Sequence, residues 1–187
     1  MGWWICNLHT LYSKILIMAN LFHPSLQIAE FVSIEVSKKG TDTTIGENCV
    51  IDNFVKIKHV GGTGSISIGK NVYLNSGCVL YSGNGITIGD DVLIGPNCNI
   101  VPSNHANKYT DSPMRKQGFQ ESNGGIIIEN DVWLGANVSV LDGSIIRKGC
   151  IIAANSLVNG DTEEYCVYAG SPIKKIKSRM WNLQYSE

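Results

Sequence analysis

One histidine in this sequence has the residue type and the surroundings that acid–base chemistry requires. His105 follows Asn104 and stands where a regular pattern of aliphatic residues gives way to a segment without it, residues 106–127. Imidazole titrates near neutral pH, so it can take a proton from a hydroxyl group as that oxygen attacks a carbonyl carbon. A lone histidine is more often a surface residue of a loop, so the catalytic interpretation depends on the elements that position it.

The other histidines and the cysteines do not form a pattern typical of metal ligands. His9 and His23 lie outside the regular pattern, His59 lies at the end of a predicted strand, and no two histidines have the short spacing of zinc ligands. The six cysteines include no CxxC pair. No glycine-rich phosphate-binding motif occurs either. We therefore expect no metal cofactor, no nucleotide hydrolysis and no hydride transfer.

The element that must position His105 is a repeat with a period of six residues. Aliphatic side chains recur at this spacing along most of the chain, and an earlier pair, Ile28 and Ile34, shares it. The residues two positions before them are also small or aliphatic, and in a strand they point to the same side. The repeated aliphatic positions are Ile45, Ile51, Ile57, Ile68, Leu74, Leu80, Ile88, Ile94, Ile100, Ile128, Leu134, Val140, Ile146, Ile152 and Val158.

A strand as short as one hexapeptide buries little by itself, so the repeat requires coils that stack on one another. The sequence therefore predicts an all-β fold, a triangular parallel β-helix with one hexapeptide on each side. Four cysteines, Cys49, Cys78, Cys98 and Cys150, fall in the inward phase of this repeat. We interpret them as compact apolar core residues, because free cysteine usually behaves in that way.

The spacing between coils shows where extra residues enter. One coil of three hexapeptides needs eighteen residues, and Ile88 and Ile128 are 40 residues apart, which one coil and a 22-residue excursion explain. Two smaller insertions, of five and two residues, precede it between Ile45 and Ile88. Long segments without repeats inside compact domains are uncommon and often functional. We therefore predict that a loop at about residues 106–127 leaves the solenoid beside His105.

Length, charge and hydropathy limit the organisation and the class of protein. The 187 residues predict a β-helix domain at 28–170, an N-terminal segment at 1–27 with apolar residues at helical spacing, and a basic C-terminal helix or tail at 171–187. A net charge of −1 gives no field that would attract nucleic acid. The apolar run at 15–22 is too short to span a bilayer, so we expect at most peripheral membrane contact. Without a secretory signal or a disulfide pattern, the expected location is the cytoplasm.

Several motifs resemble a known family. They are Ile88-Gly89-Asp90-Asp91-Val92-Leu93-Ile94-Gly95-Pro96-Asn97, Asn104-His105, Asp131-Val132-Trp133-Leu134-Gly135 and Ala169-Gly170-Ser171-Pro172. The chain is similar to the hexapeptide-repeat acyltransferases, in particular to their sugar and polysaccharide O-acetyltransferase branch. This resemblance implies a left-handed β-helix, acetyl-CoA as co-substrate, a sugar or glycan-precursor acceptor, and a homotrimer with active sites between subunits.

The resemblance also implies roles for individual residues. His105 matches the general base of the family, and Asn75 and Arg115 match acceptor-binding positions, although asparagine is also common at solenoid corners for local turn reasons. Lys174 and Lys177 belong to a charge run that is equally typical of a solvated helix face. Glu129 and Asp142 depart from the family pattern, which has glycine and proline at these positions. The residues that match the acetyl-CoA site are Trp133, Ala136, Ala154, Lys174 and Lys177.

The sequence thus predicts an acetyl-CoA-dependent O-acetyltransferase that acts on a sugar hydroxyl, in the synthesis of polysaccharide, lipopolysaccharide or another surface glycan. Two alternatives remain open at this point. The same base and donor groove would serve an N-acetyltransferase of an amino sugar on a nucleotide carrier. A solenoid of this kind also occurs without catalytic activity, as a scaffold, since a fold does not determine a function.

Overall fold

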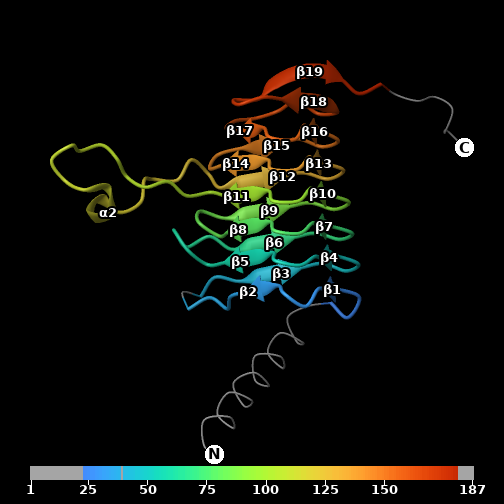
Figure 1. Ribbon diagram of the computed structural model, residues 1–187, viewed down its shortest axis with the longest axis horizontal. Helices are drawn as coiled ribbons and strands as arrows, with labels where there is room; N and C mark the ends of the chain where they lie inside the picture. Colours follow the sequence, from blue (N-terminus) through green and yellow to red (C-terminus); the bar gives the residue numbers. More distant parts are fainter. Residues whose placement is uncertain (1–22, 39, 181–187) are drawn as a thin grey trace, which may run out of the picture.

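The computed structural model of the chain describes residues 23–38 and 40–180. In this part the chain winds into a three-sided column of stacked coils, from which one long loop projects sideways (Figure 1). Most of the predicted N-terminal segment, residues 1–22, and the last seven residues of the tail, 181–187, lie outside the described residues. In the described part, no helix is long and apolar enough to cross a bilayer.

Each coil contributes a short strand to each of three sheets, which are the faces of the column. The eight-stranded face contains β1 (Gln27–Ile28), β4 (Val50–Ile51), β7 (Tyr73–Leu74), β10 (Leu93–Ile94), β13 (Trp133–Leu134), β16 (Ile151–Ile152), β18 (Cys166–Ala169) and β19 (Lys174–Ser178). The six-stranded face contains β2 (Ser33–Ile34), β5 (Lys56–Lys58), β8 (Val79–Tyr81), β11 (Asn99–Val101), β14 (Ser139–Leu141) and β17 (Leu157–Val158). The five-stranded face contains β3 (Thr43–Ile45), β6 (Ile66–Ile68), β9 (Ile86–Ile88), β12 (Ile126–Ile128) and β15 (Ile145–Ile146).

The core of the column consists of the side chains that the six-residue period predicts. All of the repeated aliphatic positions from Ile45 to Val158 are buried, as are the residues two positions before each of them from Ile51 onward. Successive coils align these residues directly, so that Ile68 pairs with Ile88 and Ile88 pairs with Ile128. The buried cysteines of the described part are free, which confirms their interpretation as core residues. Parallel stacking therefore gives every coil the same interior, one apolar layer above another.

The corners of the column use asparagine and aspartate in the left-handed backbone region, where these residues are tolerated better than others. Asn137 has φ +59°, and its side chain donates a hydrogen bond of 3.1 Å to Asn155 Oδ1 in the next coil. Asn155 itself has φ +58°. The polar corner residues thus form ladders that run parallel to the apolar core.

We expect Asn137→Ala to lower the free energy of unfolding by about 1–2 kcal/mol, because alanine keeps the steric cost of left-handed backbone without the local hydrogen bonds. Asn137→Gly should have a much smaller effect, since glycine adopts this conformation without strain. Urea unfolding of the two variants measures the difference. Equal losses in both variants would mean that the Asn155 contact, and not backbone conformation, determines the choice of asparagine.

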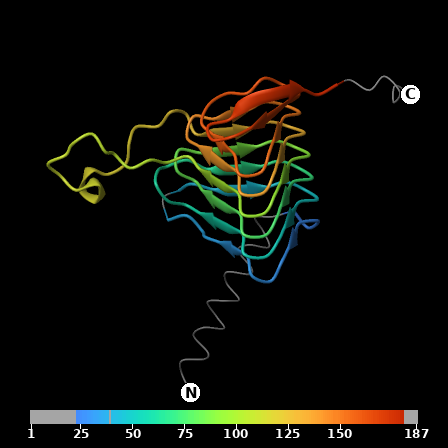
Figure 2. The same cartoon turned by 45° about the horizontal axis from the view of Figure 1, so that its top comes forward.

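The three insertions predicted after Ile45 leave the column at one corner, between the six-stranded and five-stranded faces. They are residues 59–65, 82–85 and 102–125, which connect β5 to β6, β8 to β9 and β11 to β12. The third is the predicted excursion, and it contains a short helix, α2 (Met114–Gln117). It stands away from the column in both views (Figure 1, Figure 2). The insertions therefore build one continuous region beside His105.

The C-terminal prediction was wrong in one respect. Residues 174–178, expected as part of a basic helix, form the strand β19, which pairs antiparallel with β18. The last parallel coil leaves unpaired backbone N–H and C=O groups along β18, and a strand that turns back satisfies them. A helix would have needed an apolar stripe to pack against the column, but every residue of β19 is exposed.

Candidate active site

His105 lies at the neck of the excursion, where the outgoing and returning arms pair. Its ring stacks on Phe119 with ring centroids 4.9 Å apart, and its Nδ1 lies 3.2 Å from the carbonyl oxygen of Gly118. A carbonyl oxygen only accepts, so this contact places the proton on Nδ1 and leaves the lone pair on Nε2. The side chain is exposed. The geometry therefore presents an oriented imidazole whose free nitrogen can take a proton.

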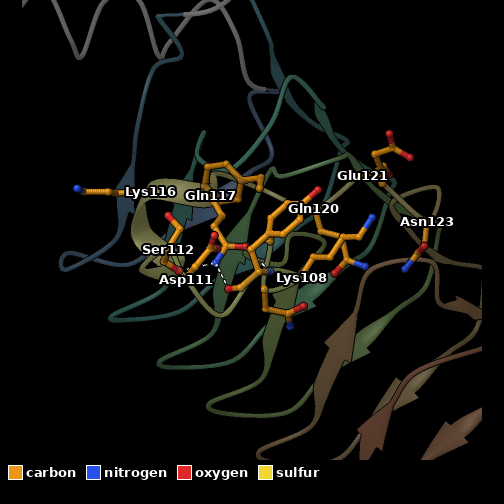
Figure 3. A pocket seen from close by; sticks show the side chains of 13 residues that line it. Lys108, Asp111, Ser112, Lys116, Gln117, Gln120, Glu121 and Asn123 are labelled. Carbon is orange, nitrogen blue, oxygen red and sulfur yellow. Dashed lines mark hydrogen bonds between the residues drawn. The ribbon is translucent and has the colours of Figure 1, made fainter.

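The excursion forms an open cavity of about 910 Å³ (Figure 3). Its volume is in the range of small-molecule sites in proteins. His105 does not line the cavity, but its chain neighbour Ala106 and its stacking partner Phe119 do. The spacing of the repeat predicts the loop but not which of its residues line the cavity, since the length of the excursion is the signal that points to them. The cavity is lined by Ala106, Asn107, Lys108, Tyr109, Asp111, Ser112, Lys116, Gln117, Phe119, Gln120, Glu121, Ser122 and Asn123.

Gln117 ties the excursion to itself and gives the cavity a fixed wall. Its Nε2 donates to the carbonyl oxygens of Tyr109 (2.8 Å) and Ser112 (2.7 Å), and its Oε1 accepts from the Tyr109 amide (3.1 Å). Arg115, which the resemblance placed at the acceptor, is exposed on α2 and does not line the cavity, whereas its neighbour Lys116 does. Most of the lining residues are polar, with both positive and negative side chains, but they expose about as much apolar as polar surface.

Asn75 lies at the opposite edge of the six-stranded face from His105. It follows β7 at the corner with the eight-stranded face, whereas His105 follows β11 at the corner with the five-stranded face. Its Nδ2 donates 2.9 Å to the carbonyl oxygen of Ile94, a contact that belongs to the turn. One chain alone therefore does not bring Asn75 and His105 together.

The residues predicted to contact acetyl-CoA gather near Asn75 and not near His105. Trp133 is half exposed on the outer side of β13, and Ala136 and Ala154 lie on neighbouring coils at the same corner as Asn75. The coils are very close here, because a β-carbon on Gly135 would lie 2.6 Å from the Ala154 nitrogen. A ligand can therefore lie flat along this corner.

The two predicted lysines lie on β19 and differ in their relation to this corner. Lys177 is in register with Val167, which aligns with Ile151 and then with Trp133, so Lys177 extends the row that contains the tryptophan. Lys174 lies at the other end of β19, beside Ala169. Both side chains are exposed, and no ion pair is seen for either in the described residues, whereas Lys175 pairs with Glu163 at 2.6 Å.

The outer side of the eight-stranded face is apolar along one row. Leu93 and Trp133 are each about half exposed, and the row continues above and below them through partly exposed side chains. The equivalent row on the five-stranded face begins with hydroxyl residues, Thr44, Ser67 and Thr87. An apolar row of this kind is typical of a surface that another molecule covers. In order of coils, the row is Val50, Tyr73, Leu93, Trp133, Ile151 and Val167.

The other histidine within the column is structural. His59 contacts the hydroxyl groups of Thr41 and Thr43 with its two ring nitrogens, each at 2.9 Å, and burial lowers its pKa. Both of its nitrogens are engaged, so it offers no free base. In the described part of the chain, no group of three or more histidine, cysteine, aspartate or glutamate side chains is arranged to hold a metal ion.

Comparisons with known proteins agree with this architecture. The family described as bacterial transferase hexapeptide (six repeats) matches residues 125–160, and the hexapeptide repeat of succinyl-transferase matches residues 85–102. Galactoside O-acetyltransferase of Escherichia coli (strain K12) is 32% identical over 158 residues, which cover 84% of this chain and 72% of that protein.

Two solved structures are similar to the fold. The N-acyltransferase AntD of Bacillus cereus aligns with a TM-score of 0.72 over 90% of each chain, at 21% identity. The hexapeptide-repeat acetyltransferase VCA0836 of Vibrio cholerae, solved with acetyl coenzyme A, aligns with a TM-score of 0.59 over 90% of this chain and 78% of that one, at 25% identity. With its repeat, its three-sided column and these relatives, the chain belongs to the hexapeptide-repeat acyltransferases, whose fold is the left-handed parallel β-helix.

Proposed function

We propose that this enzyme transfers an acetyl group from acetyl-CoA directly to a hydroxyl group of a sugar, with His105 as the general base. The observation that carries the proposal is the orientation of His105. Its Nδ1–H is held by the Gly118 carbonyl oxygen, which leaves the lone pair on Nε2, and its neighbours Ala106 and Phe119 line a cavity large enough for a sugar. This arrangement supports a base and an acceptor space close together at the excursion.

The proton path follows from the His105 tautomer. Acetyl-CoA supplies an electrophilic thioester carbonyl, and the acceptor hydroxyl supplies the nucleophile. Nε2 takes the hydroxyl proton as the oxygen forms its bond to the carbonyl carbon, and the same nitrogen returns the proton to the departing sulfur. The Gly118 carbonyl oxygen stabilises the imidazolium between these steps, because it accepts a hydrogen bond from Nδ1–H throughout.

The donor site that we propose is the corner beside the eight-stranded face. Ala136 and Ala154 are small enough to let the pantetheine arm lie along the coils, and Trp133 gives it an apolar wall. Lys177, in line with Trp133, places a positive charge where a phosphate can bind. The acetyl-CoA in the VCA0836 structure supports the same donor for this chain.

Because His105 lies at one edge of the six-stranded face and the donor corner at the other, we propose that each active site forms between two subunits of a homotrimer. In this arrangement, His105 of one subunit faces Asn75 and the donor corner of its neighbour. The apolar row that contains Leu93 supports contact between subunits, because such a row would otherwise be exposed to water.

We expect Leu93→Glu to dissociate the trimer, because it places a charge in the middle of the apolar row. Mass photometry of the wild type and the variant at equal concentration measures this. Thr87→Glu is the matched control, since Thr87 is an outward residue of the preceding strand β9 and belongs to the hydroxyl row of another face. A wild-type monomer, or dissociation by Thr87→Glu but not by Leu93→Glu, would contradict the assignment of this interface.

We propose that the acceptor is a sugar hydroxyl of a surface-glycan precursor and that the reaction takes place in the cytoplasm. The similarity to the galactoside O-acetyltransferase supports a sugar hydroxyl as the acceptor group. The free cysteines of the described part are consistent with a compartment that keeps thiols reduced, such as the cytoplasm. The fold alone also accommodates amine acceptors, as the similarity to AntD indicates.

The experiment that tests the function is thiol release from acetyl-CoA by the purified protein, over a panel of free sugars, amino sugars and nucleotide-linked amino sugars. Mass spectrometry of the product locates the new acetyl group on oxygen or on nitrogen. O-acetylation of a sugar is the expected result. Exclusive N-acetylation would replace the proposed acceptor class, and absence of both turnover and coenzyme A binding would favour a scaffold.

A further inference from the structure

A buried carboxylate lies at the neck of the excursion. Asp142 is only 8% exposed. Its Oδ2 accepts hydrogen bonds from the Asn123 amide (2.8 Å) and from Asn84 Nδ2 (3.2 Å), and its Oδ1 accepts one from the Gly125 amide (3.0 Å). Two of these donors are backbone N–H groups of the returning arm. A carboxylate is buried at this depth only where donors replace the water that it loses.

Asn84 connects the same carboxylate to the outgoing arm. Its side chain donates to Asp142, and its backbone amide donates 3.0 Å to the carbonyl oxygen of Pro102, just after β11. Beside this contact, the Gly143 amide donates 2.6 Å to the carbonyl oxygen of Gly125. Asn84 lies on the coil before the excursion and Asp142 on the coil after it. Together they hold both arms of the excursion at the neck.

At the same neck, the outgoing and returning arms pair beside His105. The Ala106 amide donates 3.1 Å to the Gly118 carbonyl oxygen, and the Gln120 amide donates 2.8 Å to the Asn104 carbonyl oxygen. This short antiparallel contact brings Gly118 and Phe119 against the His105 ring. Two hydrogen bonds are not enough to fix the register of an isolated ladder, so the register depends on where the returning arm is anchored.

We propose that Asp142 is a positioning residue for the reaction, which anchors the returning arm and thereby holds His105 in the Nδ1–H tautomer that leaves Nε2 free. This inference rests on the proposed function of His105 as the base. Asp142 does not touch His105 or the cavity, and it acts through Asn123, Gly125 and the segment that leads back to Gly118. Asp142 stands where the family pattern has proline, and this role in anchoring the returning arm explains the difference.

The chemistry of the contact explains why the residue is an aspartate. An ionised carboxylate offers only acceptors, and all three groups that face it are N–H donors. Asparagine has the same shape but must turn its NH₂ group toward one of the donors, and proline or alanine removes the acceptor of the buried Gly125 amide and of the Asn123 amide. Asp142→Asn should therefore weaken the anchoring of the returning arm in part, and Asp142→Ala should weaken it most.

The test compares Asp142→Ala, Asp142→Asn and the wild type by three measurements on the full-length protein. The first is the kcat and the KM for each substrate. The second is the tautomer of His105, from ¹³C and ¹⁵N ring shifts of histidine-labelled protein, with the signal assigned by its loss in His105→Ala. The third is the rate of tryptic cleavage at the exposed loop residues Lys108, Arg115 and Lys116.

Glu129→Ala is the matched control. Glu129 is also a carboxylate that binds the adjoining coil, since it accepts 2.8 Å from the Lys148 amide and 3.1 Å from Arg147 Nη1. It lies at the far end of β12 from the excursion. Glu129→Ala should lower the stability of the column without changing the position of His105. The comparison therefore distinguishes a general loss of stability from a loss of His105 positioning.

For Asp142→Ala we expect kcat to fall by about 10- to 100-fold, the usual effect of a small misplacement of a reacting group. The KM for acetyl-CoA should stay unchanged, the Nε2–H tautomer of His105 should appear, and cleavage in the loop should accelerate. Asp142→Asn should show the same changes in weaker form, and it replaces the alanine variant in all three measurements if that variant does not fold.

A wild-type His105 tautomer and wild-type cleavage rate in both Asp142 variants would overturn the proposal, as would equal changes in Glu129→Ala. The tautomer and cleavage measurements need no substrate. If the wild type transfers acetyl groups to no acceptor, the proposed function fails, and these two measurements still decide the role of Asp142. If the wild type is active and the variants match it in kcat, the function stands and the role of Asp142 fails.

Discussion

Replacement of His105 by alanine is expected to lower kcat by about 10²- to 10⁴-fold, which is the usual contribution of a general base. The reason is that, among the described residues, no second histidine with a free ring nitrogen lies beside the excursion. His59, the other histidine in the column, has both ring nitrogens bonded to hydroxyl groups. Thiol release at saturating acetyl-CoA measures the loss, and the KM for acetyl-CoA should change little because the donor corner is elsewhere.

Two controls make this result specific. His23→Ala removes an exposed histidine that contacts Ser25 at 2.8 Å, far from the excursion, and should leave kcat unchanged. Added imidazole should restore part of the activity of His105→Ala, because a small base can occupy the vacated space. Full activity of His105→Ala without imidazole would exclude this residue as the base and return the scaffold and other mechanisms to consideration.

Replacement of a core isoleucine is the second change with a large expected effect. Ile88 is buried in β9 and is stacked between Ile68 and Ile128 on the adjacent coils. Ile88→Ala should lower the free energy of unfolding by about 2–5 kcal/mol, from lost burial and from the cavity left between rigid coils. Urea unfolding at a fixed protein concentration measures the loss, since subunit association contributes to apparent stability.

Thr87→Ala is the control for this experiment, because Thr87 is the neighbouring residue on the same strand and points to the exposed side. Its replacement should change stability by less than about 0.5 kcal/mol, as is usual for a surface position. Ile88→Val should lie between the two, at about 0.5–1.5 kcal/mol. A loss from Thr87→Ala as large as that from Ile88→Ala would contradict the alternation on which the predicted core depends.

The sequence was sufficient for the column because its core repeats. Each inward position, such as Ile51 or Leu134, sees the same environment as its equivalent one coil away, so a single spacing rule identifies all of them. The excursion was predictable for the same reason, since the 40 residues between Ile88 and Ile128 exceed one coil. Both features follow from the spacing of residues along the chain, so they can be predicted without knowledge of contacts between distant residues.

The parts that were missed depend on contacts that no spacing encodes. The strand β19 forms because β18 has an open edge, and the sequence Lys174–Ser178 alone has too little pattern to reveal it. The contact between Asn84 and Asp142 spans 58 positions of sequence, so no local pattern reveals it. The separation of His105 from Asn75 also became visible only when their corners were placed on the column.

The antiparallel strand β19 has a consequence for assembly of the protein at high concentration. A solenoid grows by adding coils, and a bare parallel strand at its end is a template on which another chain can continue the stack. Here the last strand runs in the opposite direction and carries Lys174, Lys175 and Lys177 along its exposed length. On this face, a second column that approached end to end would meet the positive charges of Lys174 and Lys177, and such charges on an edge strand disfavour further strand pairing.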